Sequence, residues 1–200
     1  MEQIIKKIIE ILSKDGVVVL PTDTVYGICC SFESIKAYQK ILAIKGREAE
    51  KLLPVFVHCM QKAKEIAYIN KKQEQILNVF WPGSITCILK SKIKNKFNFL
   101  NTIAIRIPDN NLLLKILLEF KKPLFQTSAN LSGLNPAKNV DEIQKQFKDN
   151  FVKPDLIIDG GNLSKDLNST IVDLTKKPYR ILRQGKNYIL VQKTLERISS

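Results

Sequence analysis

The sequence predicts a single α/β domain, spanning residues 1–200, in which helices flank a twisted mixed β-sheet. Short apolar runs rich in branched residues alternate with longer segments whose apolar residues recur every three or four positions. The 200 residues, 44% of them hydrophobic, are enough to bury one sizeable core. The last predicted strands lie too close together for helical crossovers, so the sheet is mixed rather than purely parallel.

The N-terminal segment begins with an amphipathic helix. Residues 3–13 carry isoleucine and leucine at i, i+4 spacing, and Gly16 ends the segment. A β-branched run at 17–20, stopped by Pro21, is typical of a buried strand. Residues 34–44 return to helical spacing and predict a second helix.

The middle of the chain continues the alternation. Residues 53–57 form an apolar run that predicts a strand, and 70–80 predict a helix that Trp81-Pro82-Gly83 breaks. A strand is predicted at 85–89. The Lys- and Asn-rich residues 90–101 then predict a surface loop.

The C-terminal half repeats these patterns. The residues at 123–126 lead into a polar turn, TSANLSG. The predicted elements are strands at 103–107, 156–158, 169–174 and 179–183, helices at 112–120 and 140–147, and a short C-terminal helix.

The net charge of +13, from 32 Lys+Arg against 19 Asp+Glu, suggests an anionic partner such as RNA or nucleotide phosphates. However, 27 of the 32 are lysines, they are scattered, and they accompany many isoleucines and asparagines, as an AT-rich genome would produce without selection for binding. Both interpretations stay open. The five arginines are scarce enough for their positions to be informative.

The sequence indicates a soluble, cytoplasmic chain. No uncharged apolar run approaches the ~18 residues that a membrane span needs. Four charges in the first ten residues exclude a signal peptide. Among cysteines and histidine, no spacing fits a zinc site, and reduced thiols packed in the core are expected at Cys29 and Cys30.

Polar segments follow several predicted strands, at the positions where loops converge and ligands bind in open α/β sheets. Lys and Arg beside Ser and Thr hydroxyls suit phosphates and carboxylates. No acid pair and no catalytic triad stands out. The segments are 21–27 (PTDTVYG), 45–51 (KGR with a later lysine), 81–86 (WPGSIT), Thr102 with Arg106, 127–133 (TSANLSG), and Ser169-Thr170 with Arg183.

Taken in order, these motifs resemble the YrdC/Sua family of L-threonylcarbamoyladenylate synthases of transfer-RNA modification. The resemblance runs from about Gly16 to Gly185 and is closest to the short, YrdC-only form. It implies a YrdC-like fold and a nucleotidyltransferase that uses L-threonine, bicarbonate and ATP, with Mg²⁺ accompanying the triphosphate. The N-carboxythreonine carboxylate would attack the α-phosphate and expel pyrophosphate. A downstream threonylcarbamoyl transferase complex would then modify tRNA.

The resemblance also implies the site residues. The catalytic residues, which also bind the triphosphate, are implied to be Lys45, Arg47 and Lys51. Further nucleotide contacts are implied at Thr102, Asn130, Lys138 and Arg183. The threonine-binding residues are implied to be Thr22, Thr24, Arg106, Ser128 and Ser169, and which of the two loop threonines contacts the substrate stays open.

Two other classes of function compete with this one. A basic module that binds double-stranded RNA or the ribosome would use the net charge, and related domains have been linked to such roles. The sequence lacks an RNP-type aromatic motif, a KH loop and an arginine-rich stretch. A serine hydrolase using Ser128 or Ser132 would need a GxSxG elbow and a partner histidine. The synthase is therefore the favoured hypothesis.

Overall fold

The computed structural model describes residues 1–46, 53–93, 101–163 and 167–199. Within these residues one ten-stranded sheet has the order β10-β9-β5-β6-β3-β7-β2-β1-β8, with β4 pairing on β5. The strands are β1 Val17–Leu20, β2 Gly27–Ser31, β3 Val55–Phe56, β4 Ala67–Tyr68, β5 Ile85–Ser91, β6 Thr102–Arg106, β7 Leu124–Ser128, β8 Leu156–Ile157, β9 Thr170–Asp173 and β10 Arg180–Arg183. The pairs β1·β8, β3·β6 and β5·β9 are parallel and the others antiparallel, which confirms a mixed sheet.

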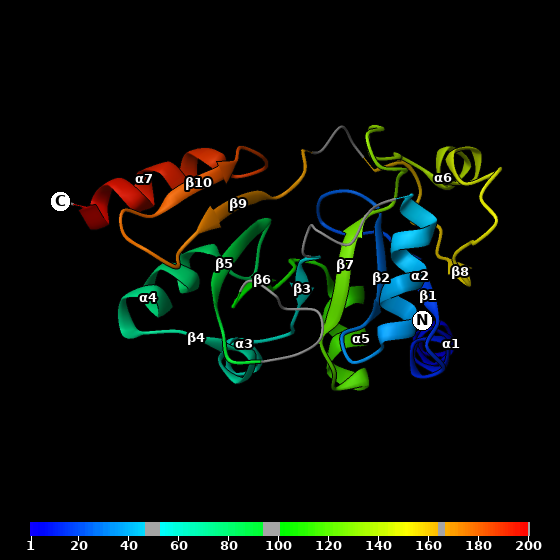
Figure 1. Ribbon diagram of the computed structural model, residues 1–200, viewed down its shortest axis with the longest axis horizontal. Coiled ribbons are helices and arrows are strands. Elements are labelled where there is room, and N and C mark those ends of the chain that lie inside the picture. The colour runs from blue at the N-terminus through cyan, green and yellow to red at the C-terminus, as the bar shows by residue number, and fades with distance from the viewer. Residues whose placement is uncertain (47–52, 94–100, 164–166, 200) are drawn as a thin grey trace.

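Seven helices lie on the two faces of the described sheet. They are α1 Glu2–Ser13, α2 Ile35–Lys45, α3 Met60–Ile66, α4 Lys71–Phe80, α5 Asn111–Phe120, α6 Val140–Gln146 and α7 Tyr188–Ser199. Helices α1 and α5 pack in one apolar core, and the other five contribute to a second core on the opposite face. Figure 1 shows α4 and α7 at one end of the molecule and α1, α2 and α6 at the other.

The run of four apolar residues in β1 shows how the sequence builds this layered structure. Val17 and Val19 pack in the larger core, whereas Val18 and Leu20 point to the α1–α5 side. All four side chains are fully buried. A strand without polar alternation is expected wherever helices cover both faces of a sheet.

The structure adds elements that the sequence analysis left unassigned. Strand β2 contains the Gly-Ile-Cys-Cys-Ser run, which lacks a polar–apolar alternation, and it is held by pairing with β1 and β7 on either side. Helix α3 is a further addition. The predicted surface loop at 90–101 begins inside β5, because β4 pairs with residues Lys90 and Ser91. No helix in the described part of the chain is long and apolar enough to cross a membrane.

Candidate active site

The face of the sheet that carries α1 and α5 changes from apolar to polar along its width. Cys87 of β5 lies opposite Ile105 of β6, and both pack in the core on the other face. Because side chains alternate along a strand, the neighbouring Thr86 and Arg106 point to the α1–α5 face. Among the described residues, the core beneath α1 and α5 receives no side chain from β5, β6 or β9.

Arg106 is the centre of this polar region. Its side chain is only 2% exposed, and its Nε donates to the carbonyl of Gly83 at 2.8 Å. Nη1 donates to Thr24 Oγ1 at 3.3 Å, and Nη2 lies 2.5 Å from Asp23 Oδ2. The guanidinium also lies over the ring of Phe56, 5.4 Å from its centroid. A charged side chain at the end of a buried strand is therefore fixed on three sides.

The loop between β1 and β2 supplies two of these partners. Thr22 Oγ1 accepts from the backbone N–H groups of Thr24 and Val25 at 3.0 and 3.2 Å and donates to the Val25 carbonyl at 2.7 Å. This local turn is typical of threonine in a tight loop. It leaves the Thr22 hydroxyl engaged within the loop, while Thr24 Oγ1 faces Arg106.

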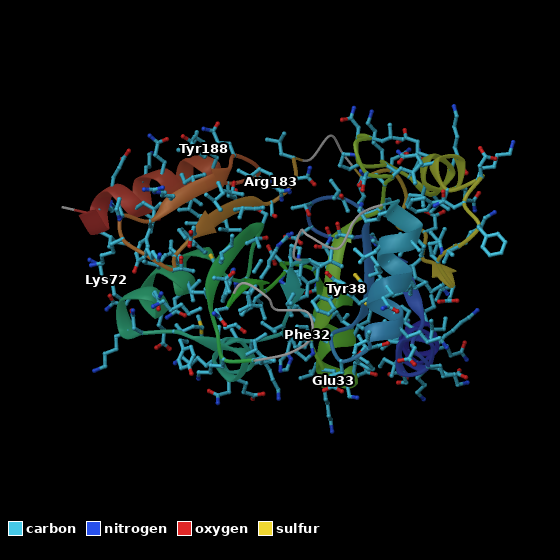
Figure 2. All side chains as sticks on the ribbon, in the orientation of Figure 1. Phe32, Glu33, Tyr38, Lys72, Arg183 and Tyr188 are labelled. Atoms are coloured by element: carbon cyan, nitrogen blue, oxygen red, sulfur yellow. The ribbon has the colours of Figure 1, made fainter. Side chains whose placement is uncertain are left out.

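The C-terminal strands contribute the other side of the region. Thr86 Oγ1 and Ser169 Oγ lie 2.9 Å apart, and Arg183 donates to Ser169 through both Nε and Nη2, each at 3.0 Å. Lys186 Nζ donates to the backbone carbonyl of Asp23 at 3.0 Å. Figure 2 shows Arg183 on the β9–β10 side, toward the middle of the molecule. Asp23 and Lys186, 163 residues apart in sequence, thus meet in this region, as do Thr86 and Ser169, which are 83 residues apart.

The electrostatics of the region are dominated by its arginines. Burial lowers the pKa of Arg106, and the Asp23 carboxylate opposes that shift. Burial also lowers the pKa of Arg183, and the positive charge of Arg106 lowers it further. Both guanidinium groups keep their charge at neutral pH, because arginine titrates far above it. Two neighbouring buried or half-buried cations favour an anion between them.

Lys45 occupies a different environment, at the C-terminal end of α2. It is 3% exposed, and its Nζ donates to the carbonyls of Ser128 and Asn130 at 2.6 and 2.7 Å. The Asn130 amide in turn donates to the carbonyls of Leu131 and Leu134. The ammonium therefore holds the end of α2 against the turn that follows β7.

The other predicted residues on the sheet share the polar face. Thr102 and Arg106 are four residues apart in β6 and so project to the same side, about 13 Å from one another. Ser128 points there too, because Gln126 lies opposite Cys29, a residue of the α1–α5 core. These side chains come from two strands and lie on one face of the sheet.

Of the remaining predicted residues, the structure describes only Lys138. Lys138 is exposed, its N–H donates to Glu142, and its carbonyl accepts from Leu163. Arg47 and Lys51 lie outside the described residues.

The structure also identifies residues that the sequence analysis missed. Asp23, Thr86 and Lys186 belong to the polar region by the contacts above, although Asp23 and Thr86 stand inside the quoted motifs. The signal that could have found Asp23 is its position as the single acid in PTDTVYG, between two hydroxyl residues. Lys186 follows the last motif and has no comparable signal.

Within the part of the chain that the structure describes, the polar region contains no metal-binding cluster, and a separate groove lies elsewhere on the molecule. In the described residues, no group of three or more His, Cys, Asp or Glu side chains could bind a metal ion. A groove of about 600 Å³ lies between α4 and α7, and Val79, Leu190 and Arg197 are among its lining residues. None of the polar residues described above lines that groove.

Comparison with protein families adds independent information. The family model Sua5/YciO/YrdC, described as "Telomere recombination", matches residues 10–185. The threonylcarbamoyl-AMP synthase of Vibrio parahaemolyticus is 34% identical over 90% of this chain and 98% of its own length. That of Pyrococcus abyssi is 31% identical over 84% of this chain, which spans about half of the longer archaeal protein.

Solved structures give the same picture of the fold. The crystal structure of P. abyssi Sua5 complexed with L-threonine superposes with a TM-score of 0.85, at 28% identity, over 92% of this chain and 55% of that one. E. coli YciO gives a TM-score of 0.82 at 26% identity, over 93% and 91% of the two chains. The predicted YrdC-like fold is therefore confirmed.

Proposed function

We propose, from the fact that the chain belongs to the Sua5/YciO/YrdC family, that it synthesises threonylcarbamoyl-AMP from L-threonine, bicarbonate and ATP. The reaction releases pyrophosphate and makes the protein a nucleotidyltransferase. Relatives that carry this name match nearly the whole chain, which favours the synthase over a basic RNA-binding module.

The chemistry of the reaction suits the composition of the polar region. N-carboxythreonine is already an anion, so its carboxylate oxygen attacks the α-phosphorus without a strong general base, and the bond to pyrophosphate breaks. What the protein has to supply is alignment of the two substrates and neutralisation of phosphate charge. Buried guanidinium groups and hydroxyls, rather than an acid–base pair, are the groups that do this.

The observation that carries the proposal is the buried Arg106 in the polar part of this sheet face. We assign it to the α-carboxylate of threonine, because a fixed guanidinium binds a planar carboxylate through two parallel hydrogen bonds. Thr24 and Ser169 supply hydroxyls within reach of the same substrate. Thr24 is favoured over Thr22 because its hydroxyl, which also pairs with that of Thr22, lies beside the Arg106 guanidinium.

The nucleotide half of the site follows from the same face of the sheet. Thr102 lies about 13 Å along β6 from Arg106, far enough to place the nucleoside beyond the threonine. Ser128 lies on the same face, in the neighbourhood of the Lys45–Asn130 turn. In this arrangement Lys45 positions the turn, and Asn130 shapes it for the nucleotide.

The remaining assignments rest on the family resemblance. Arg47 and Lys51 would bind the triphosphate, Lys138 would add a nucleotide contact, and Arg183 would neutralise charge next to Ser169. Magnesium would be carried by the triphosphate oxygens, with the chain supplying the cations around it. The mixed-anhydride product requires a downstream threonylcarbamoyl transferase acting on tRNA.

The experiment that tests the function is an omission series. Pyrophosphate release is measured with ATP, L-threonine and bicarbonate together, and then with each left out in turn. We expect release only from the complete mixture, and threonylcarbamoyl-AMP is identified by mass. An equal rate without threonine would contradict the assignment.

A further inference from the structure

We propose that Asp23 receives the α-amino group of the bound amino acid through its Oδ1 atom. Asp23 and Arg106 would then recognise the ammonium and the carboxylate of one zwitterion side by side. This inference rests on the proposed function and adds to it the residue that selects for an α-amino acid.

Only one of the two carboxylate oxygens of Asp23 has a partner within the described structure. Oδ2 lies 2.5 Å from Arg106 Nη2, and the side chain is 12% exposed. Oδ1 is buried and has no hydrogen-bond partner among the described residues. Buried carboxylate oxygens in folded proteins are almost always hydrogen-bonded, so an unpaired one points to a donor that comes from elsewhere.

The neighbouring polar groups have other partners. Thr24 Oγ1 pairs with Thr22 Oγ1 and accepts from Arg106 Nη1, and Lys186 Nζ donates to the backbone carbonyl of Asp23. Arg106 uses Nε on Gly83 and Nη1 on Thr24. The described surroundings therefore fix the carboxylate in place from one side and leave its other oxygen to a ligand.

Arg106 has the complementary capacity. A guanidinium carries five N–H donors, and the hydrogen bonds to Gly83 and Thr24 use two of them. Nη2 forms an ion pair with Asp23 Oδ2 but has no hydrogen-bond partner among the described residues, so its donors are available to a substrate carboxylate. In an α-amino acid the carboxylate and the ammonium are attached to the same carbon and so lie close together. The Arg106 guanidinium and the Asp23 carboxylate are also adjacent, because they form an ion pair. The pair is thus suited to a zwitterion rather than to a simple carboxylic acid.

Two ligands that differ only in the amino group test this directly. Binding of L-threonine and of (R)-3-hydroxybutyrate, which keeps the carboxylate and the hydroxyl, is measured by calorimetry on the wild-type chain and on Asp23→Asn. We expect the substitution to weaken the binding of threonine roughly 10- to 100-fold, as for the loss of a hydrogen bond to a charged group. Binding of 3-hydroxybutyrate should be unchanged or tighter, because Arg106 then has no competing carboxylate.

Matched variants separate this role from a purely structural one. Asp109→Asn removes an exposed acid whose charge also acts on Arg106, and it should leave both affinities unchanged. Asp23→Glu keeps the charge and should retain part of the preference for threonine. The thermal melting of each variant is recorded so that binding is compared between folded proteins.

The outcomes are distinct. If Asp23→Asn weakens the binding of both ligands equally, Asp23 only holds Arg106 in place. If it weakens the binding of neither, Oδ1 contacts only water. Either result overturns the proposal. If the wild-type chain binds threonine but releases no pyrophosphate, the proposed function fails while the role of Asp23 stands. If it does not bind threonine at all, both fail.

Discussion

Two halves of one sheet face differ in what they bury. Beneath α1 and α5, strands β1, β2, β3 and the first residue of β7 present apolar side chains to a closed core, among them Val18, Cys29, Phe56 and Leu124. On the same face, β5 and β6 present Thr86 and Arg106, which are as buried as the apolar residues but are polar or charged. Thr86 and Arg106 are thus as buried as the apolar residues of the other half, and they differ from them in the chemistry of the buried atoms.

The two halves contribute differently to stability and to function. Apolar burial contributes favourably to folding with no further requirement. A buried guanidinium carries a desolvation cost that its ion pair only partly offsets, so it is weak evidence for stability. The apolar half accounts for the fold, and the polar half is where substrate interactions can offset the cost of burying charge.

The largest expected effect comes from Arg106→Ala. Removing one partner of a buried ion pair leaves Asp23 uncompensated and should cost about 3–5 kcal/mol of folding free energy. In protein that remains folded, the KM for threonine should rise at least about 30-fold, the lower end expected for truncating a buried charged contact, with little change in the KM for ATP.

The control is Arg180→Ala, which removes an exposed arginine of β10. It should change neither constant. A KM for ATP that rises as much as that for threonine would place Arg106 in the nucleotide half and reverse the orientation of the site.

Leu117→Ala tests the apolar half. Leu117 lies in α5, is 1% exposed and packs in the α1–α5 core. A Leu→Ala change in such a site costs about 2–5 kcal/mol. We expect urea unfolding to show that loss while the KM values measured on folded protein stay at their wild-type level. If Leu117→Ala instead raised the KM for threonine without lowering stability, the apolar half would also serve substrate binding, which would contradict this comparison.

Ser169→Ala should have a smaller effect, confined to the polar half. The hydroxyl is shared between Thr86 and Arg183, and each such hydrogen bond contributes about 1 kcal/mol. The KM for threonine is therefore expected to rise a few-fold to tenfold, with melting lowered by only a few degrees. Thr194→Ala, which removes an exposed hydroxyl of α7, is the matched control.

The smallest expected effect is the change in folding stability with pH that the buried thiols cause. Burial raises the pKa of Cys29 to about 12 and raises those of Cys30 and Cys87 even further. The folded state thus keeps these protons where the unfolded state releases them, above about pH 9. Stability should consequently be complete below that pH and decline as the pH rises above it.

Urea unfolding at pH 8 and at pH 10 measures this decline, and alkylation of the native protein at pH 8 tests the burial of the thiols that causes it. Iodoacetamide should modify Cys59, which is partly exposed, and spare the three buried cysteines. Rapid modification of Cys29 would show that the apolar half opens in the native state.

Much of the fold could be predicted from the sequence because local patterns encode it. The i, i+4 isoleucines of α1 and the β-branched run of β1 are examples in which spacing alone decides the element. Strand β2 could not be predicted, since Cys29 and Cys30 carry no alternation and the strand depends on neighbours far along the chain. Register is likewise a long-range property.

The candidate site was predictable to a lesser degree. The motifs identified Arg106 and Ser169, and the structure brings both to one region with Thr24. What the motifs could not show is which polar atoms remain unpaired after folding. Asp23 reads as an ordinary loop acid in the sequence, and its significance arises only from the contacts that its two oxygens make and lack.

Hydrogen exchange with and without ligands tests the central comparison most directly. Amide exchange, followed by mass spectrometry, is measured on the free protein and with L-threonine and ATP added. We expect slower exchange in the loop at 22–26 and in the peptides that contain Thr86, Arg106 and Ser169, with no change in α1 or α5. Protection confined to α1 and α5, or to the groove between α4 and α7, would contradict it.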